Sequence, residues 1–336
     1  MMELRKIQET GGGTLVVSLP KNWAVRNNLR KGSVVSLGPQ PDGRLIIDPS
    51  YEKPLEPSEF TISYPTERAS FLRWTILGGY LLGYDVIKIQ GENRIRHADR
   101  ERMKKTIRRL IGLEILDEDA YTISAQCVLD PSLLAPKKII GRMNTITLSM
   151  REDSISSLLE ADEELARALK YRDDEVDRLY FLAVRLLRSA VGNPKLAEKF
   201  DVLPVGCLDY RVAAHLIESI GDYSVQIAEV GSKMPKMEFT AELKRMFHSL
   251  SSALVELQRM GVDTLLTEES SRTRIRILGE IRDRHSELSE ISESLGERIA
   301  KEPEGLIPYL STVSSLLDKI GGCCIDIADL AAGFGP

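Results

Sequence analysis

Four carboxylate residues occur as two pairs whose spacing suits metal binding. Asp173 and Asp177 are four residues apart, and so are Glu218 and Asp222. Residues four apart share a face of a helix, so each pair can converge on one point. Two facing acidic pairs repel each other unless a cation neutralises them, and such oxygen donors suit iron, magnesium, manganese, calcium or zinc. The pattern is therefore open between a metal site and a solvated acidic helix face.

A second group of residues could bind nucleic acid. Residues 1–50 carry seven Lys or Arg and four Asp or Glu, a net charge of +3, whereas the whole chain carries −5. A basic segment on an acidic protein attracts phosphate. The alternative is a module that dimerises without binding DNA. The candidate DNA contacts are Arg5, Lys6, Lys21, Arg26, Arg30 and Lys31.

A third group is a run of cations between residues 94 and 109. It could contact nucleic acid or a phosphate-bearing ligand. Asp99 and Glu101 interrupt the run, which favours a solvated helix face instead. The cations are Arg94, Arg96, Arg100, Arg102, Lys104, Lys105, Arg108 and Arg109.

No pattern typical of an enzyme accompanies these groups. The sequence has no Gly-x-Ser-x-Gly, Walker A or His-Glu-x-x-His pattern, so we expect no catalytic residues and no enzymatic activity. Its four cysteines form no Cys-x-x-Cys pair, which fits a reduced, cytoplasmic setting. The N-terminus lacks the apolar core of a signal peptide, and the longest apolar stretch is too short to cross a bilayer.

Three regions with different patterns must position these residues. Residues 3–48 predict two small β hairpins with turns at Gly11–Gly13 and Pro41–Gly43, followed by a proline-rich linker from Pro49 to Pro57. Strands and helices alternate over residues 59–129, and only helices are predicted from residue 139 onward. The predicted fold is therefore multidomain: a small β head, an α/β connector and an all-α body. We expect domains at 1–50, 58–132, 139–234 and 237–333.

The helical region contains an internal repeat. The segment that begins Leu216-Ile217-Glu218 aligns with Leu316-Leu317-Asp318 at an offset of 100 residues without a gap. The shared Ile-Gly dipeptide and the matched acidic positions indicate duplication of a three-helix unit. The second copy departs from the first, because Gly322 replaces Asp222 and His285 and Ser289 replace the earlier aspartate pair. At most Asp318 and Glu287 remain there as weak ligands.

The helix from Glu218 to Glu229 and the segment Asp173-Asp174-Glu175-Val176-Asp177 resemble the signature helices of the PhoU family. The resemblance covers about 139–333 and implies a duplicated three-helix bundle with a carboxylate-x-x-x-Asp motif in each half. It also implies a metal cofactor, a divalent or trivalent ion such as iron, zinc, manganese or magnesium. The ligands carried over are Asp173, Asp177, Glu218 and Asp222.

Residues 3–48 resemble the AbrB/SpoVT (MazE-like) DNA-binding fold. The resemblance rests on Leu19-Pro20-Lys21, a short predicted helix, and Leu29 to Val35 in the order leucine-x-x-glycine-x-x-valine. It implies a homodimer of swapped β hairpins with cations on one face. A segment as short as residues 3–48 buries little surface by itself, which also favours a core shared between two copies.

Together the two resemblances imply an archaeal-type phosphate uptake regulator. Its expected partners are DNA, a second copy of the chain, inorganic phosphate and components of a phosphate transporter or its regulation. The alternative is an adaptor whose head only dimerises, while the body docks on a phosphate transporter or a sensor kinase.

Overall fold

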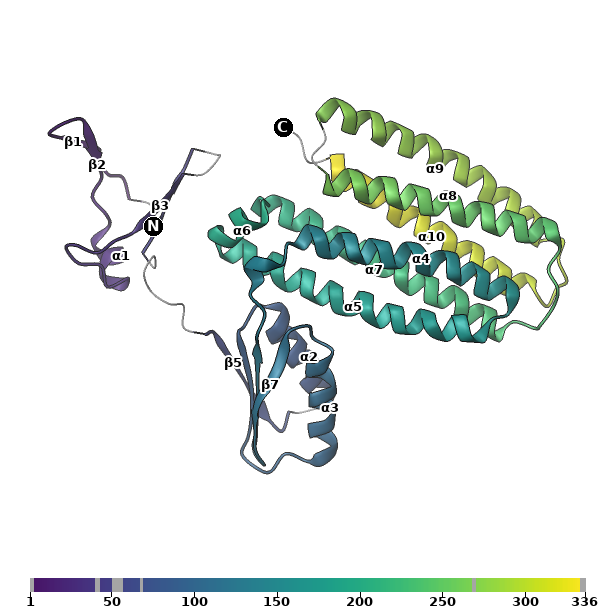
Figure 1. Ribbon diagram of the computed structural model, residues 1–336, viewed down its shortest axis with the longest axis horizontal. Coiled ribbons are helices and arrows are strands. Elements are labelled where there is room, and N and C mark those ends of the chain that lie inside the picture. Colours follow the sequence, from purple (N-terminus) through teal and green to yellow (C-terminus); the bar gives the residue numbers. More distant parts are fainter. Residues whose placement is uncertain (1–2, 40–42, 50–56, 67–68, 268–269, 333–336) are drawn as a thin grey trace. The chain divides into compact units, whose positions relative to one another are not determined.

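The computed structural model describes residues 3–39, 43–49, 57–66, 69–267 and 270–332 of the 336-residue chain. The chain divides into two compact units, Met1–Pro57 and Ser58–Pro336. Short β hairpins come first, a small α/β region follows, and helices make up the rest (Figure 1). This order confirms the predicted multidomain fold. The finer boundaries predicted within residues 58–336 stay predictions.

The first unit, which we call the head, consists of two antiparallel hairpins and one short helix. Strand β1 (Gln8–Thr10) pairs with β2 (Thr14–Val16), and β3 (Ser36–Pro39) pairs with β4 (Leu45–Asp48). Helix α1 (Lys21–Arg26) lies between the hairpins in the sequence, directly after Pro20. Gly12 and Gly13 have φ angles of +92° and +84°, which only glycine adopts readily, so the predicted turn forms there.

Two further predictions for the head fall mainly on residues that the structure does not describe. Of the turn predicted at Pro41–Gly43, only Gly43 is described, with φ +80°. Of the predicted linker, residues 50–56 lie outside the described ranges.

The head has no core of its own within its described residues. Each of those side chains is exposed or half-buried, and none is fully buried. Large apolar side chains stand in solvent: Leu15 is 68% exposed, Leu37 59% and Val34 52%. Folded domains bury such residues against one another. A single copy of the head therefore lacks the hydrophobic burial that stabilises a fold.

The second unit begins with a four-stranded sheet covered by two helices, which we call the connector. Its order is β5 (Glu59–Tyr64), α2 (Ala69–Leu81), β6 (Val86–Gly91), α3 (His97–Arg108), β7 (Leu113–Glu118) and β8 (Thr122–Cys127). The spatial order is β5-β6-β8-β7; β5 and β6 are parallel and the other pairs antiparallel. Alternate residues of β6 and β8, such as Ile87 and Ile123, are buried with apolar residues of α2 and α3. The pattern follows from the period of two in a strand.

Long antiparallel helices form the rest of the second unit, which we call the body (Figure 1). After a 3₁₀ turn at Pro131–Leu133 come α4 (Pro136–Glu160), α5 (Glu163–Gly192), the short α6 (Pro194–Phe200) and α7 (Pro204–Lys233). Then follow α8 (Ala241–Leu266), α9 (Ser271–Ile299) and α10 (Ile307–Ala332). Helices α4 and α7 pack on α8 and α10, so one apolar core runs through all six long helices.

Local sequence explains where these helices begin. The side chain of Asp162 accepts hydrogen bonds from the first backbone N–H groups of α5, and Thr240 and Ser270 cap α8 and α9 in the same way. Proline opens α4 and α7, where its missing N–H has no consequence. Helix α4 begins at Pro136, three residues before the predicted start.

The connector and the body are joined by a buried arginine. The guanidinium of Arg185, on α5, donates to the carbonyl oxygens of Tyr80 at 2.8 Å, Tyr84 at 2.9 Å and Gly83 at 3.2 Å. Tyr80 lies in the last turn of α2, and Gly83 and Tyr84 follow it closely, so the cation also meets the negative end of the helix dipole. The contact fixes α2 against the helix that carries Asp173 and Asp177.

Candidate functional site

The structure gathers the two predicted acidic pairs at the contact between α5 and α7. Asp173 and Asp177 lie one turn apart on α5, and Glu218 and Asp222 lie one turn apart on α7. Asp173, Asp177 and Glu218 are half-buried, and Asp222 is exposed; the side chain of Glu218 is 19% exposed and that of Asp177 26%. We call these four residues the acidic cluster. Another acidic residue of α7, Glu229, pairs instead with Lys170 at 2.7 Å.

The acidic cluster binds protons unusually tightly. Burial, together with the negative charges of Asp222 and Asp177, raises the pKa of Asp173 to about 7. Burial likewise raises the pKa of Glu218 to about 7, again with help from the neighbouring carboxylates. The pKa values of Asp177 and Asp222 are also raised, chiefly by burial. The two pairs therefore face each other closely enough to repel, as their spacing predicts.

One oxygen of the cluster lacks a hydrogen-bond donor. Oδ1 of Asp173 is buried, lies against Gly221, and accepts no hydrogen bond from the described residues. A buried carboxylate oxygen without a donor is unfavourable unless a proton or a cation satisfies it. The described residues contain no group of three or more His, Cys, Asp or Glu side chains arranged so that they could hold a metal ion. The cluster thus fits a cation in charge and donor type, while that geometry is not formed.

An arginine of the connector stands beside the acidic cluster. The Nη2 atom of Arg109, just beyond α3, is 2.6 Å from Oδ1 of Asp174 and 3.2 Å from Oδ2 of Asp177. Its charge opposes the rise in the pKa of Asp177 that burial causes. On the other side, His215 Nδ1 is 3.2 Å from Oε2 of Glu218. Arg109 therefore neutralises part of the negative charge of the cluster.

Among its described residues, the second half of the body has no matching acidic cluster. Asp318 accepts a hydrogen bond from Ser292 at 2.6 Å, and the hydroxyl of Ser289 donates to its own helix. Asp173 Oδ1 lies beside Gly221, 3.4 Å from where a Cβ atom on that glycine would be. Nε2 of His285 lies beside Gly321 in the same way, at 4.0 Å. An imidazole thus stands where the first half has a carboxylate.

All predicted DNA contacts of the head are solvent-exposed. They are Arg5, Lys6, Lys21, Arg26, Arg30 and Lys31. Arg5 forms an ion pair with Glu3, and the backbone N–H of Arg30 donates to the Ser33 hydroxyl at 2.9 Å. These exposed cations, which lie before β1, on α1 and in the segment after α1, are available to phosphate.

The predicted basic helix divides into two groups. Some of its cations hold the connector together: Lys104 pairs with Glu118 at 2.8 Å, and Arg100 donates to the carbonyl of Asp119. Others line a cavity between α2, α3 and α5. The sequence pattern identified these cations as a group. It did not predict the cavity, or the pairing of Arg109 with Asp174 and Asp177, which lie 65 and 68 positions later in the chain.

Comparison with known proteins agrees with the two parts of the molecule. The PhoU domain model matches residues 140–231, which span α4 to nearly the end of α7. The model for antidote-toxin recognition MazE, bacterial antitoxin, matches residues 8–55. No curated protein matches the chain. In the described ranges, no helix has both the length and the apolar character needed to cross a membrane. The chain therefore combines a MazE-like (AbrB-like) antitoxin domain at its N-terminus with a PhoU domain in its helical body.

Proposed function

We propose that the protein is a cytoplasmic, DNA-binding regulator of phosphate uptake that acts as a homodimer. The PhoU domain indicates a role in phosphate homeostasis, and the MazE-like domain indicates DNA binding. The observation that carries the proposal is the coreless head. Its exposed apolar side chains, including Leu15 and Leu37, gain burial only against another surface, and a second head supplies one by symmetry.

The charge of the head supports DNA as its partner. Two copies double a net charge of +3, and the predicted contacts are all exposed. Phosphate contacts of this kind supply affinity without sequence preference. In this proposal the body acts as the sensor and the heads bind the operator.

The salt dependence of DNA binding tests this role. We expect the full chain to bind duplex DNA, and the double variant Lys21→Ala/Arg26→Ala to bind more weakly whatever the sequence. Each lost phosphate contact should reduce the slope of log affinity against log salt by about one unit. The matched control Lys138→Ala/Arg167→Ala removes two exposed charges from the body and should leave both quantities unchanged. Equal binding by all three proteins would contradict a DNA-binding head.

The acidic cluster is proposed as the sensing site. Asp173, Asp177, Glu218 and Asp222 would hold a divalent or trivalent cation such as iron, zinc, manganese or magnesium. The observation in support is the buried Oδ1 of Asp173, which has no donor among the described residues. A bound multivalent cation can also attract inorganic phosphate. We propose no enzymatic activity for this site.

An exposed apolar stripe supports the second candidate, an adaptor that docks on a phosphate transporter or a signalling kinase. Val205, Leu208 and Val212 follow each other at helical spacing on α7, and they are 63%, 63% and 44% exposed. Exposed apolar stripes of this kind mark protein-protein contacts. If the chain binds a phosphate transporter or a signalling kinase but does not bind DNA, the adaptor is favoured.

A further inference from the structure

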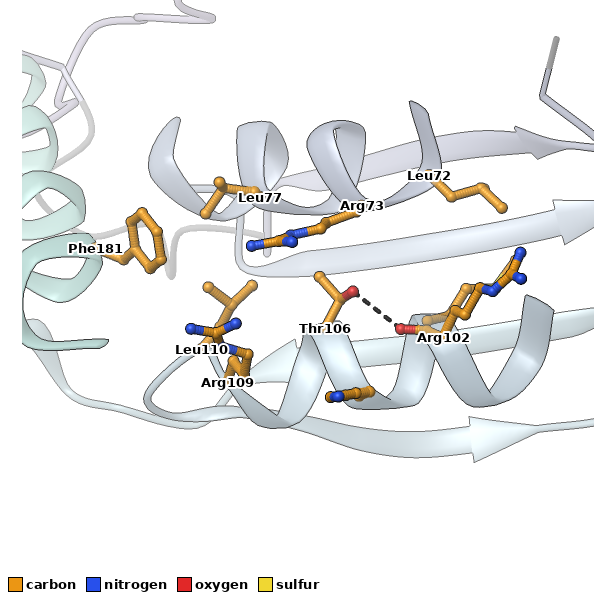
Figure 2. Close-up of a pocket in the computed structure, with 10 residues that line it drawn as sticks. Leu72, Arg73, Leu77, Arg102, Thr106, Arg109, Leu110 and Phe181 are labelled. Atoms are coloured by element: carbon orange, nitrogen blue, oxygen red, sulfur yellow. Dashed lines mark hydrogen bonds between the residues drawn. The ribbon is translucent and has the colours of Figure 1, made fainter. Parts of the chain in front are cut away.

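A cavity of about 380 Å³ lies where the connector meets the body, between α2, α3 and α5 (Figure 2). Its volume is within the range of sites for small molecules, roughly 300–1,000 Å³. The cavity lies outside the acidic cluster and the head, and the proposed function assigns it no role.

One part of the cavity wall is apolar. Leu72 of α2, Met103 of α3 and the adjoining Leu110 are buried, and Leu77 and Phe181 close one end (Figure 2). Phe181 comes from α5, so the body completes the wall. An apolar wall with an aromatic ring suits a flat, weakly polar group and gives no binding to a hydrated inorganic ion.

The other part of the wall is cationic and contains no carboxylate. Arg73, Arg102, Lys105 and Arg109 line it, and no Asp or Glu is among the lining residues. Two of the four are already paired: Arg102 with Asp99 at 3.3 Å, and Arg109 with acidic residues of α5. Within the described part of the chain, the side chains of Arg73 and Lys105 form no ion pair and no hydrogen bond.

Several cations around one opening favour a multivalent anion over a single carboxylate, because each added charge strengthens the attraction. A second groove continues from the cavity along α3 and α5, where Arg108 and Arg178 add two cations beside Glu101 and Asp174. We propose that the cavity binds an organic phosphate with a flat apolar body, of the purine nucleotide class. The base would lie against Phe181, and the phosphates would meet Arg73 and Lys105.

The position of Arg109 links this cavity to the body. The guanidinium lines the cavity and also contacts Asp174 and Asp177. A bound phosphate would compete with these carboxylates for the same cation. Removing one competing carboxylate should therefore strengthen nucleotide binding, which gives a test that does not depend on loss of function.

Calorimetric titration of the full chain with ADP, adenosine and pyrophosphate tests the proposal. We expect ADP to bind saturably, and adenosine and pyrophosphate each to bind at least about tenfold more weakly, since each lacks one half of the ligand. The Arg73→Ala/Lys105→Ala variant should lose about tenfold or more in ADP affinity. Asp174→Asn should bind ADP severalfold more tightly.

The control variant Arg94→Ala/Arg96→Ala removes two exposed cations from the segment before α3, outside the cavity. It should bind ADP as the wild type does. Equal affinity for pyrophosphate and ADP, an equal loss of affinity in the control variant, or no heat from millimolar ADP would each overturn the proposal.

Discussion

Two buried arginines of the body differ in what satisfies their charge. Arg185 donates to three backbone carbonyls and lies 5.0 Å from the ring centre of Tyr80. Arg151, on α4, is fully buried; it donates to Gln258, but its Nε and Nη1 atoms have no partner among the described residues. Burial accordingly lowers the pKa of Arg151. A buried charge without full compensation destabilises a fold.

Replacing each arginine by methionine should therefore have opposite effects on stability. We expect Arg185→Met to lower the free energy of unfolding by about 3 kcal/mol, because it leaves carbonyls without donors. Arg151→Met should leave it unchanged or raise it by up to about 4 kcal/mol. Urea unfolding followed by circular dichroism measures both variants. Equal losses would show that the polar contact of Arg151 with Gln258 outweighs its desolvation.

The acidic cluster gives the body a pH dependence of defined sign. Because the folded pKa values of Asp173 and Glu218 are raised to about 7, the folded state binds these protons more tightly than the unfolded chain does. The resulting stabilisation is complete below the unfolded pKa of about 4 and is lost as the pH rises through about 7. Metal-free protein should therefore become less stable between about pH 5 and pH 8.

The variant Asp173→Asn/Glu218→Gln isolates this contribution. Its unfolding free energy should fall less over the same pH range than that of the wild type. The difference should be about 1–2 kcal/mol, since solvent screens these half-buried groups. Parallel pH profiles for the two proteins would contradict the raised pKa values.

At the scale of elements, the sequence predicts the types and order of the main segments well. Alternation of apolar residues marks β6 and β8, and proline and glycine mark the ends of the long helices. Boundaries differ by a few residues, as at Pro136, because helix ends depend on capping and packing. The predicted division of the helical region into two repeats stays a prediction.

The acidic cluster could be predicted because residues four apart share a helix face. The partners of the cluster could not, because Arg109 reaches it through packing of the connector on α5. The same packing creates the cavity, whose aromatic wall comes from Phe181. A local pattern contains no information about contacts between segments so far apart.

A metal in the acidic cluster would join α5 to α7. We expect iron, manganese, zinc or magnesium to raise the thermal midpoint of the wild type, because binding to the folded state alone stabilises it. Without metal, Asp222→Asn should be as stable as the wild type or slightly more stable, since one repelling charge is gone. With metal, Asp222→Asn should lack the rise in thermal midpoint that the wild type shows.

The second half of the body provides the control for this experiment. Asp318→Asn removes a carboxylate that accepts a hydrogen bond from Ser292 and has Gly322, not an aspartate, four residues later. This variant should therefore respond to metal as the wild type does. If no metal raises the wild-type midpoint more than that of Asp222→Asn, and none co-purifies, the acidic cluster is only a solvated helix face.

At the scale of the whole molecule, the two units differ in how far they bury their own apolar side chains. The second unit has two clusters of buried apolar residues, in the connector and in the body. The head has no buried side chain among its described residues, so we expect its folding to depend on association. In the proposed function, DNA is therefore bound only by the dimer, and we expect a signal that changes the body to act on the spacing of the two heads.

The mass of the protein–DNA complex tests this claim most directly. Sedimentation of the full chain with a short labelled duplex at low salt should show a bound species with an even number of chains. That species should dissociate steeply as salt is added, because bound phosphates release counterions. A complex with one chain per duplex, or no complex at low salt, would contradict a dimeric DNA-binding head.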